Sequence, residues 1–182
     1  MAKFVSALTA AHRDFIAAQK IYFVASAPAT GRVNLSPKGI DTFRVLSATR
    51  VGYLDVTGSG NETAAHLLEN GRITLMMCSF DTAPLIFRIY GRGRSVQPAD
   101  ADWTQLRPLF GPPIPGERQL IDVEIESIQT SCGFGVPFFT YTGERETLIN
   151  YSEKKGPDGM ASYRAKNNRQ SIDGRPTGLL ET

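Results

Sequence analysis

Residues 51–70 read VGYLDVTGSGNETAAHLLEN, and this stretch passes from one kind of secondary structure to another. Residues 51–56 are rich in apolar and β-branched side chains, which predicts a strand. Residues 57–60 predict a loop, and residues 61–70 predict a helix that ends before Gly71. Ser59 and Glu62 have the spacing of a capping box at the helix start. The stretch therefore predicts a strand that leads through a small, flexible loop directly into a helix.

Short β-rich segments surround this strand–loop–helix unit on both sides. Apolar runs separated by turn residues predict further strands over residues 21–26, 32–36, 43–47, 72–80, 85–96 and 119–129. Gly91 and Gly93 predict a bulge or a sharp bend. Helices are predicted over residues 3–20 and 99–109. Because many short strands come with few helices, we expect a mainly β fold with added helices, a barrel rather than a parallel sheet.

The composition is that of a globular protein whose charges nearly balance. The chain has 182 residues, which fits one domain, or one domain with a tail. Its formal net charge of +2 gives no reason to expect nucleic acid or an anionic membrane as a partner. No apolar run approaches the ~20 residues that cross a bilayer, and the first residues lack a signal-peptide core, so a cytoplasmic location is expected. Two cysteines and two histidines are too few to suggest a structural zinc site.

The loop and the helix start have the chemistry of an anion site. A helix N-terminus carries unpaired N–H groups and the positive end of the helix dipole, so it attracts a phosphate. The glycines allow close approach of the backbone, and Ser59, Asn61 and Thr63 add side-chain donors. The spacing matches neither a Walker A motif nor a Rossmann fingerprint. The alternative is that these residues only turn and cap the chain, and the carboxylate of Glu62, which competes with a phosphate, favours that alternative.

Lys38 is a second candidate for contact with the same ligand. It follows the strand predicted over residues 32–36, within the segment NLSPKG at residues 34–39. An ammonium group at this place can pair with a phosphate as a point charge. The alternative is a solvated turn lysine, and the segment alone does not choose between the two.

In their order along the chain, these segments resemble the pyridoxamine 5'-phosphate oxidase family of FMN-binding split barrels. The resemblance extends over about residues 15–131 and rests on VNLSPKG at 33–39, VGYLD at 51–55, GSGNET at 58–63, AHLLEN at 65–70, the strand at 72–80 and FRIYGRG at 87–93. It implies FMN bound at the interface of a homodimer. It also implies an FMN-binding split-barrel domain with its N-terminal helix over residues 1–131. Residues 132–182 are then a partly irregular extension that packs on the barrel.

The resemblance and the local chemistry together nominate eight cofactor-binding residues. They are Asn34, Ser36, Lys38, Thr57, Ser59, Asn61, Thr63 and Arg88. Arg88 interrupts an apolar strand, where it faces a cofactor, the partner subunit or solvent. Cys132 has no neighbouring cation or histidine that would activate it, so we expect a structural or flavin-adjacent role for it. Catalytic residues are not identified, and no metal is expected.

Three functions are compatible with the sequence. The leading hypothesis is an FMN-dependent oxidoreductase of unknown substrate, in which the flavin accepts a hydride and the protein supplies binding and orientation. The expected partners are a second copy of the chain and a small-molecule substrate or nicotinamide donor. The second hypothesis is a non-enzymatic flavin-binding or sensing protein. The third is a split barrel that uses haem or a deazaflavin, although two histidines weigh against haem ligation.

Overall fold

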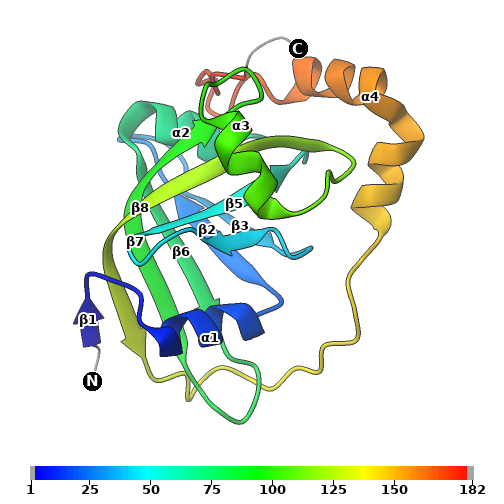
Figure 1. The fold of residues 1–182 in the computed structure, drawn as a ribbon. Helices are drawn as coiled ribbons and strands as arrows, with labels where there is room; N and C mark the ends of the chain where they lie inside the picture. Colours follow the sequence, from blue (N-terminus) through cyan, green and yellow to red (C-terminus); the bar gives the residue numbers. More distant parts are fainter. Residues whose placement is uncertain (1–2, 180–182) are drawn as a thin grey trace.

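One antiparallel sheet curls into a barrel and forms most of the molecule (Figure 1). The computed structural model describes residues 3–179. The strand order is β3-β2-β6-β7-β8-β5-β4, and β1 pairs with β8. The strands are β1 (Lys3–Val5), β2 (Tyr22–Ser26), β3 (Asn34–Lys38), β4 (Phe43–Val45), β5 (Arg50–Val56), β6 (Arg72–Cys78), β7 (Ile86–Val96) and β8 (Glu117–Ser131). The prediction of a mainly β fold with added helices is confirmed.

The two longest strands carry the bend that the glycines predict. β7 and β8 are paired along their length, and their register shifts between Tyr90 and Gly91. A Cβ atom at Gly91 would lie 2.2 Å from the carbonyl oxygen of Glu124, so only glycine fits there. Such a bulge increases the local twist, which helps the sheet to curve.

Side chains that alternate along the strands fill the interior. In β2, Tyr22, Val24 and Ser26 are buried, whereas the residues between them are more exposed. The largest completely buried apolar side chains belong to β5, β6, β7 and β8: Tyr53, Leu54, Leu75, Phe87, Ile89, Leu120, Ile121 and Ile128. The sheet is therefore packed from within, and any ligand site has to lie at an edge or an end of the barrel.

The prediction of a helix over residues 3–20 is wrong for the first residues of this segment. Lys3–Val5 form β1 and pair with β8, and α1 covers only Ala10–Ala18. The side chain of Thr9 accepts a hydrogen bond from the backbone N–H of His12, and the His12 ring accepts one from the N–H of Thr9. This reciprocal cap fixes the first residue of α1, which apolar spacing alone does not reveal.

β3 lies two residues further along the chain than the strand predicted over residues 32–36. The predicted strand ends before Pro37, whereas Pro37 is part of β3. β3 is an edge strand that pairs only with β2, and an edge tolerates the missing N–H of a proline. As a result, Lys38 is the last residue of the strand rather than a turn residue.

One of the next two helices agrees with its predicted range, and the other is shorter than predicted. α2 (Glu62–Asn70) matches its prediction, and Gly71 ends it with a left-handed φ of 70°. The helix predicted over residues 99–109 is shorter. α3 (Trp103–Leu106) passes into a 3₁₀ turn, η1 (Arg107–Phe110), because Pro108 lacks the N–H that a continuing α-helix would use.

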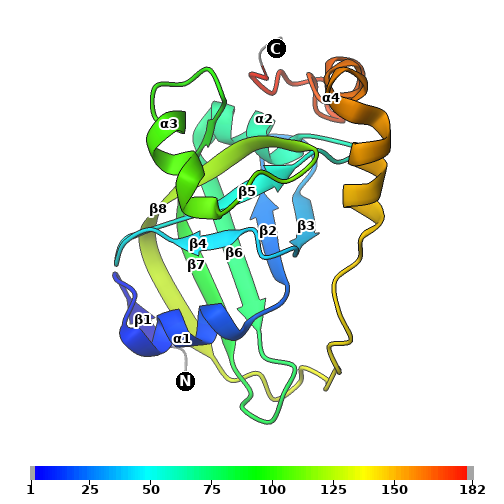
Figure 2. The same ribbon diagram turned by 45° about the vertical axis from the view of Figure 1, so that its right-hand side comes forward.

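The C-terminal segment wraps around one side of the barrel (Figure 2). Residues 132–146 form a long connection to α4 (Thr147–Asn167), which bends at Gly156. α4 was not predicted, because Gly156 and Pro157 interrupt its sequence pattern. Residues 168–179 then return toward α2, and we call them the C-terminal hook. The division into residues 1–131 and 132–182 stays a prediction, and residues 1–2 and 180–182 lie outside the described part of the chain.

Candidate functional site

A cavity of about 920 Å³ lies between β3, the loop after β5 and the first turn of α2. The C-terminal hook forms another part of its wall. Six of the eight predicted residues line it: Asn34, Ser36, Lys38, Ser59, Asn61 and Thr63. The structure therefore brings together the two separate segments that the sequence singled out.

Side-chain hydrogen bonds join β3 to α2 on the cavity wall. Ser36 Oγ donates to Asn34 Oδ1 at 3.1 Å, and Asn34 Nδ2 donates to Thr63 Oγ1 at 3.2 Å. Thr63 is the acceptor in this contact, so its own hydroxyl proton can be donated to another group. The wall thus presents hydroxyl groups that suit an oxygen-rich ligand.

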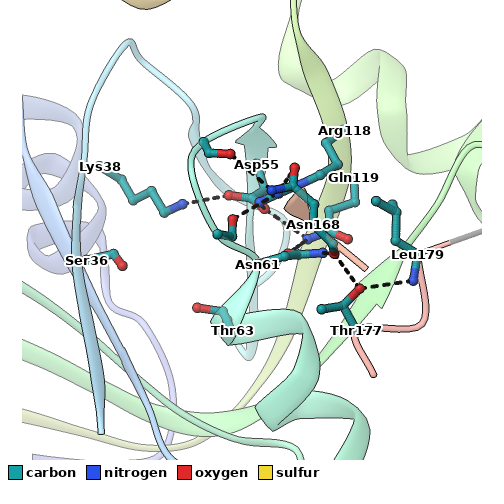
Figure 3. A network of polar contacts seen from close by, with 12 residues as sticks. Ser36, Lys38, Asp55, Asn61, Thr63, Arg118, Gln119, Asn168, Thr177 and Leu179 are labelled. Atoms are coloured by element: carbon teal, nitrogen blue, oxygen red, sulfur yellow. Dashed lines mark hydrogen bonds and ion pairs between the residues drawn. The ribbon is translucent and has the colours of Figure 1, made fainter. Parts of the chain in front are cut away.

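Asp55 is the buried centre of a polar network in the wall of the cavity (Figure 3). Its carboxylate accepts hydrogen bonds from Lys38 Nζ (2.6 Å), Arg118 Nη2 (2.6 Å) and Gln119 Nε2 (2.9 Å). Gln119 Nε2 also donates to Asn61 Oδ1 at 2.8 Å. Burial alone would raise the pKa of Asp55, but the charges of Arg118 and Lys38 outweigh burial and hold this pKa well below its ordinary value. Asp55, Lys38 and Arg118, which we call the Asp55 trio, therefore carry one net positive charge.

The flexible loop is fixed through its carbonyl groups. Arg118 Nη1 donates to the carbonyl of Gly60 at 3.0 Å, and Asn168 Nδ2 donates to that of Gly58 at 3.1 Å. Arg118 Nη1 also donates to Asn168 Oδ1 at 2.8 Å, which ties the hook to the barrel. The loop that the sequence predicts as flexible is thus held from behind by two buried side chains.

Glu62 does not form the predicted capping box with Ser59. Asn61 is the N-cap residue, and its side chain makes no capping hydrogen bond. Both oxygens of the Glu62 carboxylate instead lie within hydrogen-bond distance of the backbone N–H of Ile172, at 3.0 and 3.1 Å. The capping-box prediction is wrong because the partner of this carboxylate lies 110 residues away in the hook.

Thr57 and Arg88, the other two predicted residues, are not among those that line the cavity. Thr57 is buried, and its N–H donates to the carbonyl of Gly116 at 2.8 Å. Arg88 lies on β7 and donates to Ser131 Oγ at 3.3 Å. Their roles as cofactor ligands stay predictions, including a role for Arg88 toward a partner subunit.

The sequence did not single out four buried polar residues of the site: Asp55, Arg118, Gln119 and Asn168. Asp55 and Arg118 line the cavity, and the other two are not among the lining residues. A signal existed for Asp55, because a carboxylate inside the apolar run 51–56 needs a cationic partner once it is buried. Arg118 and Gln119 lie 63 and 64 residues from Asp55, and no local pattern connects them. Asn168 belongs to a polar segment that gives no sign of burial.

Three further residues have clear positions. His66 is buried and lines the cavity, and its Nδ1 atom lies 2.9 Å from Ser26 Oγ. Cys78 is buried, and Cys132 is exposed. Within residues 3–179, no cluster of His, Cys, Asp and Glu could hold a metal ion. No helix of the described chain is long and apolar enough to span a membrane.

The curled antiparallel sheet and the polar cavity at a strand–loop–helix junction define a split β-barrel protein. The chain belongs to the pyridoxamine 5'-phosphate oxidase family, whose model matches residues 8–132. A curated relative, the pyridoxamine 5'-phosphate oxidase family protein ustO of Aspergillus flavus, is 38% identical over 183 residues. That match covers 90% of this chain and 73% of the relative. The family resemblance predicted from the sequence is therefore confirmed.

Solved structures agree with the fold. A candidate pyridoxamine 5'-phosphate oxidase from Lactobacillus delbrueckii matches with a TM-score of 0.53 and 17% identity, covering 68% of this chain and 94% of that one. HupZ of Group A Streptococcus matches with a TM-score of 0.51 and 19% identity, covering 66% of this chain and 91% of that one. At these identities the likeness concerns the fold alone.

Proposed function

We propose that this chain binds FMN in the cavity and works as an FMN-dependent oxidoreductase. The observation that carries the proposal is that Lys38, the hydroxyl group of Thr63 and the first turn of α2 line one cavity. A cation, a hydroxyl donor and a helix N-terminus are the groups that bind a phosphate. Membership of the pyridoxamine 5'-phosphate oxidase family supports a flavin as the molecule that bears this phosphate.

The charges around the cavity suit one phosphate group. The Asp55 trio carries one net positive charge, because its two cations share one carboxylate. The N-terminus of α2 adds the equivalent of about half a positive charge. Arg32, which also lines the cavity, forms an ion pair with Asp173, so this pair adds no net charge. Glu62 is the opposing charge, and its carboxylate is hydrogen-bonded to the hook. The balance therefore favours an anion near Lys38.

Bound FMN would supply hydride and electron transfer, and the protein would bind and orient it. In this proposal Lys38 and Thr63 hold the phosphate. Asp55 keeps the ammonium group of Lys38 at the cavity wall, and Arg118 fixes the loop before α2 through the carbonyl of Gly60. Because these groups are positioned by buried contacts, little ordering is needed when the ligand binds.

Flavin content and flavin reduction test the proposal. The purified protein should release FMN on extraction, or bind added FMN with quenching of its fluorescence. Anaerobic addition of NADH or NADPH should bleach the bound flavin, and an electron acceptor should restore its absorption. A protein that binds no FMN would refute the proposal. Bound flavin that neither donor reduces would favour the binding or sensing alternative.

We also propose that the chain works as a homodimer with a small-molecule substrate or nicotinamide donor. Val33 and Leu35 are 73% and 65% exposed beside the cavity, on the edge strand or directly before it. An edge strand with exposed apolar side chains is a surface that a second copy can cover. A dimer formed there would place the partner next to the proposed flavin site.

A further inference from the structure

The C-terminal hook closes the cavity beside the first turn of α2, where the proposed function places the phosphate. Gln170, Ser171 and Ile172 line the cavity. The backbone N–H of Ile172 is hydrogen-bonded to Glu62, the first residue of α2. A group that extends from a phosphate at this place toward residues 170–172 therefore meets the hook.

The start of the hook is anchored by a completely buried side chain. Asn168 has 0% exposure, accepts a hydrogen bond from Arg118 at 2.8 Å and donates one to the carbonyl of Gly58 at 3.1 Å. The backbone carbonyl of Asn168 accepts a hydrogen bond from Thr177 Oγ1 at 2.7 Å. Figure 3 draws this contact as a dashed line. Because removal of such buried polar contacts is costly, the hook has a fixed position.

Ion pairs anchor the tip of the hook to both elements beside the cavity. Asp173 forms an ion pair with Arg32 in the turn before β3. Its carboxylate also accepts a hydrogen bond from the backbone N–H of Arg32 at 2.8 Å. Arg175 pairs with Glu69 of α2 at 2.6 Å and donates to the carbonyl of Thr30. The hook thus bridges α2 and the β2–β3 turn, so it occupies the space between them.

We infer that the hook makes the site selective for FMN, whose phosphate monoester is terminal, over FAD, in which the same phosphate is joined by an anhydride bond to a second phosphate. The inference rests on the proposed function and deepens it. FAD carries a second phosphate and an adenosine on the phosphate with which FMN ends. With the phosphate at the first turn of α2, these groups extend toward the wall that residues 170–172 form, and the second phosphate adds negative charge beside Glu62. A clash and an unfavourable charge both discriminate against the larger ligand.

Dissociation constants for FMN, FAD and riboflavin, measured by calorimetry on the full chain, test this inference. The wild-type protein should bind FMN about tenfold or more tightly than FAD. The double variant Asp173→Ala/Arg175→Ala releases the tip of the hook without changing the net charge and keeps the buried anchor. In this variant the ratio of the dissociation constant for FAD to that for FMN should fall at least about threefold, because FAD binds more tightly. The dissociation constant for riboflavin should not change.

The matched control is Arg92→Ala/Glu126→Ala, which removes an exposed ion pair elsewhere on the sheet and is also neutral in net charge. It should keep the wild-type ratio. Equal binding of both flavins by the wild type, or an unchanged ratio in the folded hook variant, would overturn the inference alone. If the double variant does not fold, Asp173→Asn/Arg175→Gln removes both ion pairs with smaller changes of side-chain size, is also neutral in net charge and gives the same comparison. Failure of the wild type to bind any flavin would remove the proposed function and this inference together.

Discussion

The sequence identifies Lys38 as a candidate phosphate ligand, but it does not reveal which residues surround this side chain. The sequence leaves two options, a solvated turn lysine or a phosphate ligand. In the structure its ammonium group lies 2.6 Å from the Asp55 carboxylate and 5.5 Å from the centre of the Tyr53 ring. Both partners come from β5, which no local pattern connects to β3. The pairing rules out a freely solvated side chain and holds the charge at the cavity wall.

Removal of the Lys38 charge should weaken FMN binding and leave riboflavin binding unchanged. A hydrogen bond to a charged group contributes about 1.5–3 kcal/mol, so Lys38→Met should raise the dissociation constant for FMN by about 10- to 100-fold. Calorimetric titration with both ligands measures this. Lys154→Met, at an exposed position on α4, is the control and should bind FMN like the wild type. An equal loss for riboflavin would show that the lysine does not act through the phosphate.

Asp55→Asn should destabilise the fold most at neutral pH. The pKa of Asp55 in the folded state lies below the value of about 3.9 for an unfolded chain. Its ionised form therefore stabilises the protein above that value, and the stabilisation is lost as the pH falls toward the folded-state pKa. Disruption of a buried ion pair costs about 3–5 kcal/mol. Denaturant unfolding of both proteins should show a difference at about pH 7 that shrinks toward about pH 3. A difference independent of pH would contradict this account.

At the scale of elements, some helices and strands were predicted from patterns within or next to their own sequence. Others depend on a pairing partner from a distant part of the chain. α2 and β7 were predicted because Gly71 directly follows the first segment and an apolar run lies inside the second, at residues 85–90. β1 is a strand only because β8 offers it an edge, so no local signal exists for it. β3 continues through Pro37 because it is an edge strand, which is a property of the sheet and not of the segment.

The bulge in β7 gives a prediction at this scale. Gly91→Ala should destabilise the fold by about 1–3 kcal/mol, because its Cβ would collide with the Glu124 carbonyl, a backbone atom that cannot move aside. Urea unfolding measures the change. Gly135→Ala is the matched control, since a Cβ there meets no atom within 4 Å, and it should unfold like the wild type. Equal stability of the two variants would mean that the strands shift to relieve the contact.

At the scale of the whole molecule, the candidate site consists of three distant parts of the chain. Two of them, β3 and the junction of β5 with α2, were predicted because each carries turn and donor residues in a recognisable order. The third, the hook, was missed because the contacts that join it to the rest of the site are long-range: Asn168 reaches Gly58 across 110 residues. Sequence therefore predicted the residues that face a ligand better than the buried residues that hold them in place.

The proposed dimer depends on the face beside this site, and its disruption should weaken flavin binding as well as assembly. Size exclusion with light scattering should give the wild type twice the chain mass of 19.9 kDa. Leu35→Asp places a charge on the exposed edge strand and should shift the protein toward the monomer, with a higher dissociation constant for FMN. Leu109→Asp, at a position that is 53% exposed on η1, is the control and should remain dimeric. A wild-type monomer that binds FMN would overturn the shared site, because one chain would then supply the complete cavity.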